Sequence, residues 1–101
     1  MQQFRLAVLK LTGYRVDLPE SRRYHLYSSY THRSHVLRFQ QSAAGEMQLL
    51  ESEFAQQLGP QMEAYLRERD SIPAFLAATT LALFDEACPP PLKNDENAMV
   101  R

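Results

Sequence analysis

The sequence predicts an α+β fold with an N-terminal helix, a small antiparallel sheet of four strands, and C-terminal helices that pack on the sheet. Three observations support this fold class. Apolar residues recur at helical spacing in residues 1–12, short segments with two-residue alternation follow between residues 14 and 50, and helical spacing returns after Leu50. With 101 residues, of which 45% are hydrophobic, the chain is expected to form one domain around a buried core.

Residues 1–12 are expected to form a stem helix. Its apolar residues recur at steps of three, four and three, which is the seam of a coiled coil. The seam residues are Met1, Phe4, Val8 and Leu11, while Leu6 lies off the seam. Such a short stretch is not stable by itself, so the helix either ends a longer coiled coil or leans on the domain. A strand over residues 4–8 is the competing interpretation. Gly13 stands where glycine often ends a helix.

Four strands are expected over residues 14–18, 23–30, 35–40 and 46–50, with turns at 19–22 and 42–45. Strands at these intervals are typical of an antiparallel meander. Spacings of three and four from Val36 to Leu58 also permit one long helix through Gly45, and periodicity alone leaves both alternatives open.

Two helical segments are expected after the sheet. An apolar stripe over residues 54–66 is interrupted by Gly59-Pro60, where a kink or short break is predicted. The second helix, Ile72–Ala87, has Pro73 in its first turn and either Asp70 or Ser71 as its N-cap.

The second of these helices is apolar nearly all round, so it is expected to be buried nearly all round. Phe75, Leu76, Leu83 and Phe84 are predicted to be core residues. Three prolines end the helix, and residues 89–101 are expected to be a disordered tail.

The residues that could carry chemistry do not form a recognisable catalytic or metal-binding pattern. His32 and His35 have no cysteine or paired carboxylate nearby, and the single Cys88 has no basic partner at a fixed spacing. Three scattered glycines cannot form a phosphate-binding loop. We therefore expect no enzyme activity, no metal, no cofactor and no small-molecule substrate.

The charge is divided between the two halves of the chain. Residues 1–45 carry seven Arg/Lys and two acids, whereas residues 46–101 carry four Arg/Lys and ten acids. The basic half could attract an acidic or phosphorylated partner. A small nucleic-acid-binding domain that uses the basic half is the alternative function, although a pI near 6.3 weighs against it.

The location of the protein is also constrained by composition. No run of eighteen apolar residues exists, so no membrane span is expected. The first residues lack a signal-peptide layout, and one cysteine permits no internal disulfide. An intracellular, reducing compartment is the simplest interpretation.

Several motifs resemble the C-terminal end of the mitotic-arrest-deficient-one family of spindle assembly checkpoint proteins. The strongest match runs from Leu66 to Phe84 and includes Arg69-Asp70-Ser71-Ile72-Pro73-Ala74-Phe75-Leu76. Met47-Gln48-Leu49-Leu50-Glu51 resembles the last strand of the family's domain, and Leu11-Thr12-Gly13-Tyr14 and Tyr24-His25-Leu26 also fit. The matches follow one another in order across residues 4–84.

The resemblance implies a fold and an assembly. The expected fold is RWD-like, with the sheet rather than the long helix. It implies a stem helix over residues 1–12 that ends a parallel coiled coil, a globular domain over residues 13–88, and a homodimer. The dimer interface would then include Phe4, Val8 and Leu11.

The resemblance also implies a scaffolding function at kinetochores in mitosis, with location in the nucleus and at the nuclear envelope in interphase. Implied partners are a phosphorylated segment of the checkpoint kinase of the budding-uninhibited family and the N-terminal region of the anaphase activator. A HORMA-class checkpoint partner would bind upstream of this chain.

Two departures from the family pattern affect the partner site. The family's Arg-Leu-Lys motif, which lies in the coiled coil before the stem, does not occur here, and neither does a phosphorylatable threonine near the C-terminus. The candidate partner-binding residues are therefore Arg5, Lys10, Arg67 and Arg69, since arginine geometry suits phosphate and carboxylate groups.

Overall fold

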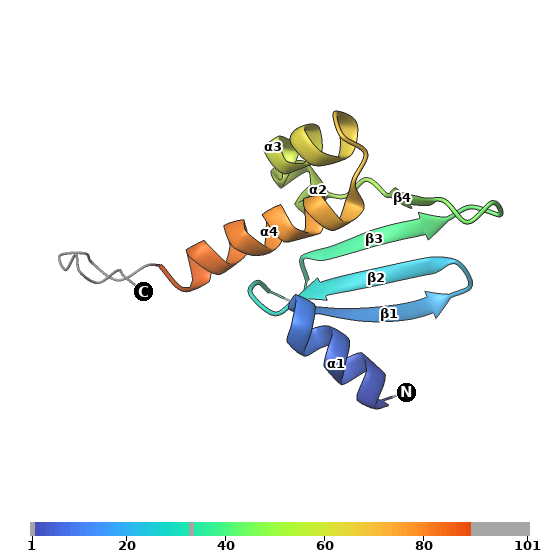
Figure 1. The fold of residues 1–101 in the computed structure, drawn as a ribbon, viewed down its shortest axis with the longest axis horizontal. Helices are drawn as coiled ribbons and strands as arrows, with labels where there is room; N and C mark the ends of the chain where they lie inside the picture. Colours follow the sequence, from blue (N-terminus) through green and yellow to red (C-terminus); the bar gives the residue numbers. More distant parts are fainter. Residues whose placement is uncertain (1, 33, 90–101) are drawn as a thin grey trace.

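The computed structural model describes residues 2–32 and 34–89. In order along the chain come a helix, four strands and a group of helices (Figure 1). This arrangement confirms the predicted α+β class and excludes the long helix through Gly45. Among the described residues, no helix is long and apolar enough to cross a membrane.

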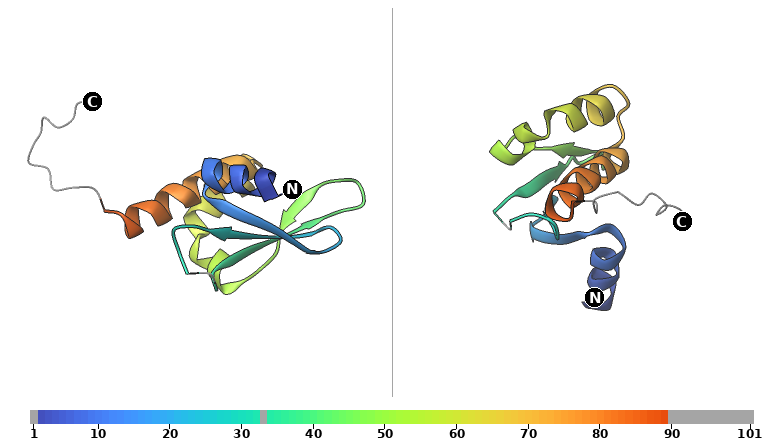
Figure 2. Two further views of the ribbon diagram at one scale, coloured as in Figure 1. Left: turned by 90° about the horizontal axis from the view of Figure 1, so that it is seen from below. Right: turned by 90° about the vertical axis from the view of Figure 1, so that its left-hand side faces the viewer.

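The stem helix α1 (Gln2–Thr12) ends at a glycine, as predicted. Gly13 has a φ of +82° and donates its N–H to the Leu9 carbonyl oxygen at 2.8 Å. The Thr12 hydroxyl then accepts a hydrogen bond from the Tyr14 N–H at 3.1 Å. The chain therefore turns sharply from α1 into the first strand, and α1 projects from the body of the domain (Figures 1 and 2).

The sheet is a four-stranded antiparallel meander in the order β1-β2-β3-β4. Its strands are β1 (Tyr14–Glu20), β2 (Arg23–Ser28), β3 (Val36–Gln41) and β4 (Met47–Leu49). The expected turn at residues 19–22 is shorter than predicted, because β1 continues through Pro19 to Glu20. Proline is tolerated there because β1 is an edge strand, and the pairing with β2 is irregular at this point.

The core lies between one face of the sheet and the C-terminal helices. From the sheet it takes the alternate side chains of Leu37 and Phe39, which are 1% and 2% exposed. Phe75, at 0% exposed, is the largest fully buried side chain and comes from the last helix. The ring of His35 stacks on Phe54 at 4.9 Å between centroids, so this histidine is packed against the core.

The segment after the sheet is broken into three short helical pieces, α2 (Glu53–Gln57), α3 (Gly59–Gln61) and a π-helix, η1 (Met62–Arg67). Ser52 caps α2 by accepting the Ala55 N–H at 3.0 Å. The sequence predicts a break at Gly59-Pro60; the break occurs one residue earlier, at Leu58, so Gly59 and Pro60 begin α3, and the π-helix was not predicted.

The last helix is α4 (Ile72–Ala87). Ser71 is its N-cap and accepts the Ala74 N–H at 3.1 Å, while Asp70 takes a left-handed φ of +51°. Of the two candidate caps, Ser71 is thus the one used.

The prediction that α4 is buried nearly all round is wrong. Phe75 and Leu83 are buried and Leu76 is partly buried, as expected, but Phe84 is 39% and Leu81 63% exposed. The buried residues of α4 recur at steps of four on one face, at Phe75, Thr79 and Leu83, whereas Leu81 and Phe84 lie off that face and are not covered by the sheet. The C-terminal part of α4 also extends beyond the ends of the strands (Figures 1 and 2). The ring of Phe84 instead packs edge-on against the ring of Tyr30, with 5.3 Å between the ring centroids. Of the predicted tail, residues 90–101 lie outside the described residues.

Candidate functional site

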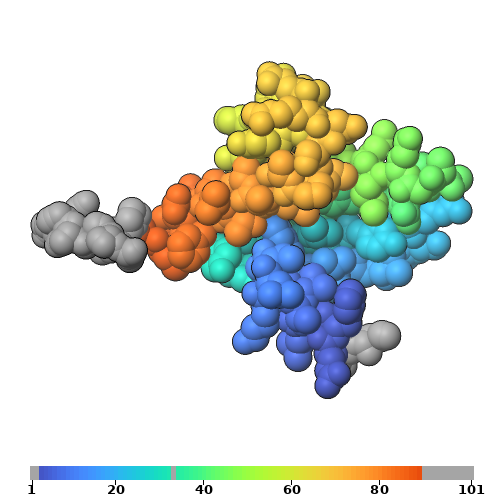
Figure 3. All heavy atoms as spheres, in the orientation of Figure 1, coloured from blue at the N-terminus to red at the C-terminus, as the bar shows by residue number. Residues whose placement is uncertain are grey.

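An apolar groove of about 700 Å³ separates the stem helix from α4. We call it the stem groove. α1 contributes Val8 and Leu11 to one wall, and α4 contributes Leu76 and Leu81 to the other. The floor is formed by strands β1 and β2, including Tyr14. In Figure 3, α1 in blue projects below α4 in orange.

The stem groove is bordered by side chains that are apolar and exposed. Leu11 is 84% and Leu81 63% exposed, and Phe4, one turn before Val8 on the same face of α1, is 70% exposed. Full burial of each such side chain stabilises a complex by about 1.5–3 kcal/mol. A contiguous apolar surface of this kind is typical of a protein–protein interface.

Tyr14 fixes the floor of the stem groove to α4. Its side chain is 3% exposed, and its hydroxyl donates to the Leu76 carbonyl oxygen at 3.5 Å. Burial raises the pKa of the Tyr14 hydroxyl above its ordinary value of 10.0, and the neighbouring Thr80 side chain lowers it by a smaller amount. At neutral pH this group is therefore a neutral hydrogen-bond donor.

The structure places the predicted interface residues on one face of α1. Val8 and Leu11 lie in the stem groove, and Phe4 extends the same face toward the start of α1. Sequence reasoning did not find the α4 wall, because it assigned that helix to the core. The all-round apolar character of α4 was the available signal, since a side chain that the domain leaves uncovered needs another partner.

The four predicted partner-binding residues do not form one surface. Arg5 and Lys10 lie on α1, whereas Arg67 ends η1 and Arg69 follows it, and these two regions flank opposite edges of the sheet (Figure 1). Arg5 pairs with Asp17 at 2.8 Å and Arg67 pairs with Glu63 at 3.5 Å. The guanidinium of Arg69 lies 5.0 Å from the ring centre of Tyr65. Two separate basic positions therefore exist, on α1 and at the end of η1.

Within residues 2–32 and 34–89, no group of three or more His, Cys, Asp or Glu side chains could hold a metal ion. His32 and His35 lie with ring centroids 6.3 Å apart. Each has a local partner, because His32 bonds Ser34 and His35 bonds Thr31, both at 2.9 Å. These contacts indicate that each histidine stabilises the loop between β2 and β3, and they require no metal ion.

Comparison with known proteins agrees with this architecture. The family described as "MAD: Mitotic checkpoint protein" matches residues 1–88, which include every described helix and strand. The chain belongs to this mitotic checkpoint protein family. It is 44% identical over 87 residues to the human mitotic spindle assembly checkpoint protein MAD1. The aligned part covers 83% of this chain but only 12% of the human protein.

Membership in the MAD family places the chain among proteins of the spindle checkpoint and mitosis. Family membership also confirms the resemblance noted in the sequence, which favoured a sheet over one long helix between Val36 and Leu58. Because the chain corresponds to a small part of its human relative, the match identifies a domain of a MAD protein rather than the activity of a whole one.

Proposed function

We propose that this chain is a homodimeric, non-enzymatic interaction module from the C-terminal end of a spindle checkpoint scaffold, with a kinetochore-targeting role. The observation that carries the proposal is the stem groove. Its two walls, α1 and α4, both present exposed apolar side chains, so the described residues of one chain leave the groove unfilled.

A second copy of the chain would cover these surfaces in one symmetric arrangement. Two α1 helices side by side would bury Phe4, Val8 and Leu11 along their common seam. A short coiled coil of two α1 helices would be only marginally stable by itself. The α4 wall, with Leu81, would add apolar contact area to this interface. The stem helices would then run parallel and continue into the upstream coiled coil.

The proposed partner is a phosphorylated segment of the checkpoint kinase of the budding-uninhibited family. Lys10 on α1 is exposed and makes no ion pair with a described residue, so its ammonium group is available to a phosphate. Arg69 supplies a second position, away from the stem, where an acidic segment could bind, whereas the neighbouring Arg67 is already paired with Glu63. The N-terminal region of the anaphase activator is the second proposed partner, and a HORMA-class partner would bind upstream.

Titration of the kinase peptide tests this proposal. Phosphorylated and unphosphorylated forms would be added to this chain and to one extended upstream. We expect the phosphorylated form to bind more tightly, with Lys10→Gln weakening its binding about threefold to tenfold. Equal affinity of both peptide forms for both chains would contradict the proposal. Fluorescent tagging of the extended protein should place it in the nucleus and at the nuclear envelope in interphase, and at unattached kinetochores in mitosis.

The charges of the N-terminal half do not favour the nucleic-acid alternative. Arg5 and Arg15 both contact Asp17, and Arg23 lies 3.6 Å from Glu20. Three of the basic groups are thus partly neutralised within the sheet and stem. Nucleic-acid binding would require a salt-dependent complex with single-stranded or duplex nucleic acid, and its absence at low salt would remove this alternative.

A further inference from the structure

The outer edge of strand β4 has backbone groups that no described element pairs. The Ser42 N–H donates to the Glu46 carbonyl and the Leu50 N–H donates to the Arg38 carbonyl, at 2.7 and 2.8 Å. In an antiparallel pair, these bonds direct the even-numbered residues of β4 toward β3. The N–H and C=O groups of Met47 and Leu49 therefore point away from β3, along the open edge of the sheet.

The opposite edge of the sheet is protected against strand addition. Strand β1 contains Pro19 and an irregularity in its pairing, and Arg5 donates to the outward-facing Val16 carbonyl at 3.4 Å. Prolines, irregular pairing and covering side chains are the usual means by which proteins block edge strands. β4 has no proline or lysine, so of the two sheet edges this is the one that the described residues leave open to another strand.

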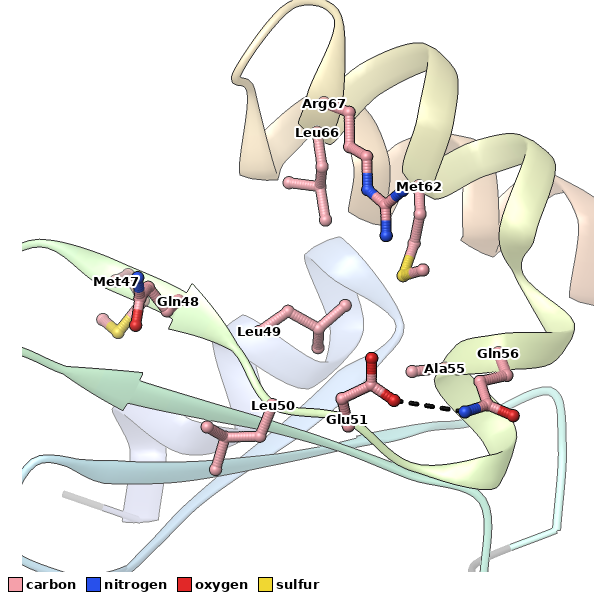
Figure 4. A pocket seen from close by; sticks show the side chains of 10 residues that line it. All are labelled: Met47, Gln48, Leu49, Leu50, Glu51, Ala55, Gln56, Met62, Leu66 and Arg67. Carbon is pink, nitrogen blue, oxygen red and sulfur yellow. Dashed lines mark hydrogen bonds between the residues drawn. The ribbon is translucent and has the colours of Figure 1, made fainter.

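A groove of about 380 Å³ runs beside the open edge, and we call it the edge groove. Its other wall comes from α2 and η1. In Figure 4 the side chain of Leu49 points toward Met62 and Leu66 on η1, whereas that of Leu50 points the opposite way. A strand added to β4 would place alternate side chains over this apolar part of the groove.

The π-helical geometry of η1 forms this wall. The Glu68 N–H donates to the Glu63 carbonyl, five residues earlier, at 3.0 Å. Residues spaced four or five apart then share one side, which brings Met62, Leu66 and Arg67 together at the groove. Helical distortions of this type occur frequently at functional sites.

The charge beside the edge groove selects a basic occupant. Residues 46–61 contain Glu46, Glu51 and Glu53 and no Lys or Arg. Glu51 lies in the groove, where one carboxylate oxygen accepts a hydrogen bond from Gln56 at 3.1 Å. The only basic side chain in the lining, Arg67, is paired with Glu63.

We propose that the edge groove binds an extended peptide segment with alternating apolar residues and flanking Lys or Arg residues, which adds a strand to β4. Backbone hydrogen bonds to Met47 and Leu49 provide affinity, and the apolar wall of η1 provides specificity. This site lies at the opposite edge of the sheet from the stem groove, so it does not depend on the proposed homodimer.

Selection from a displayed library of random peptides on the 101-residue chain tests this proposal. The selected peptides should share apolar alternation and basic flanks. Met47→Pro removes an outward N–H without removing a bond to β3, whereas Met47→Val keeps that N–H. Binding of the selected peptides should fall about tenfold in Met47→Pro and stay within about twofold in Met47→Val.

A second pair of variants tests whether the acidic charge of the edge groove is required for peptide binding. Glu51→Lys should weaken binding about fivefold or more, while Glu86→Lys, the same change on exposed α4, should leave it unchanged. Selection of no peptide, selection of acid-flanked peptides, or equal binding by both Met47 variants would overturn the proposal.

If Met47→Pro fails to fold, amide NMR of the parent chain can still locate the peptide-binding site. A selected peptide should shift the resonances of residues 47–51 and 62–67 and leave those of α1 unchanged. Shifts confined to α1 and α4 would instead assign the peptide to the stem groove. If Met47→Pro lowers the mass of the unliganded chain, the occupant is a second copy, and the proposal fails.

Discussion

The guanidinium of Arg5 on α1 donates to the carboxylate of Asp17 on β1 at 2.8 Å. The same nitrogen lies 3.4 Å from the Val16 carbonyl oxygen. This contact joins the stem to the first strand across the sharp turn at Gly13. It also means that Arg5, a predicted partner contact, already has an intramolecular partner.

We predict a small coupling energy between Arg5 and Asp17. Their side chains are 53% and 32% exposed, so water and salt screen the pair, and a double-mutant cycle with Arg5→Gln and Asp17→Asn should give about 0.5 kcal/mol. Amide exchange of α1 should accelerate in both single variants. A coupling indistinguishable from zero, with unchanged exchange, would show that the pair does not hold the stem.

The raised pKa of Tyr14 predicts a loss of stability in alkali. The folded chain holds the phenolic proton more tightly than the unfolded chain, so the stabilisation is complete below pH 10.0 and is lost as the pH rises through the raised pKa. Urea unfolding at about pH 8 and about pH 11 should show a smaller loss in Tyr14→Phe than in the parent chain. An equal loss in both proteins would contradict this assignment.

The buried hydroxyl of Thr79 predicts a stabilising substitution. Thr79 is 0% exposed, and its hydroxyl oxygen has no hydrogen-bond partner among the described residues. Thr79→Val replaces the hydroxyl by a methyl group of similar size and should raise the free energy of unfolding by about 1 kcal/mol. Thr79→Ser, which keeps the hydroxyl and loses the methyl group, should lower it. Destabilisation by Thr79→Val would indicate an unseen partner for the hydroxyl.

Gly13 predicts a destabilising substitution at the junction of stem and domain. Its φ of +82° lies in the left-handed region, and an added Cβ would stand 3.3 Å from Cε2 of Tyr30. Gly13→Ala should therefore cost about 1–2 kcal/mol of folding free energy. Gly59→Ala is the matched control, since nothing lies within 4 Å of its added Cβ, and it should be neutral or slightly stabilising. Chemical denaturation of both variants measures the difference.

The order of elements could be predicted from the sequence because each depends on local chemistry. Two-residue alternation gave the strands, glycine ended α1, and Ser71 with Pro73 began α4. The continuation of β1 through Pro19 could not be predicted in this way. Proline disfavours a central strand but is accepted on an edge, and edge position is decided only when the strands assemble.

The candidate site was only partly predictable for a related reason. The seam of Phe4, Val8 and Leu11 appears as a spacing within one helix. The α4 wall depends on which face of that helix the sheet leaves uncovered, and the edge groove depends on a π-helix and on which backbone groups face outward. These are relations between elements, so residue spacing alone did not indicate them.

The mass of the chain in solution tests the proposed homodimer most directly. Light scattering at micromolar concentration should give about twice 11.7 kDa. Phe4→Asp combined with Val8→Asp should lower the mass to that of a monomer, because both changes place charge on the seam of α1. Leu6→Asp is the matched control on the same helix; Leu6 is 55% exposed but lies off the seam, so this variant should remain dimeric. A mass of 11.7 kDa for the unaltered chain, or equal masses for the seam and control variants, would contradict the account.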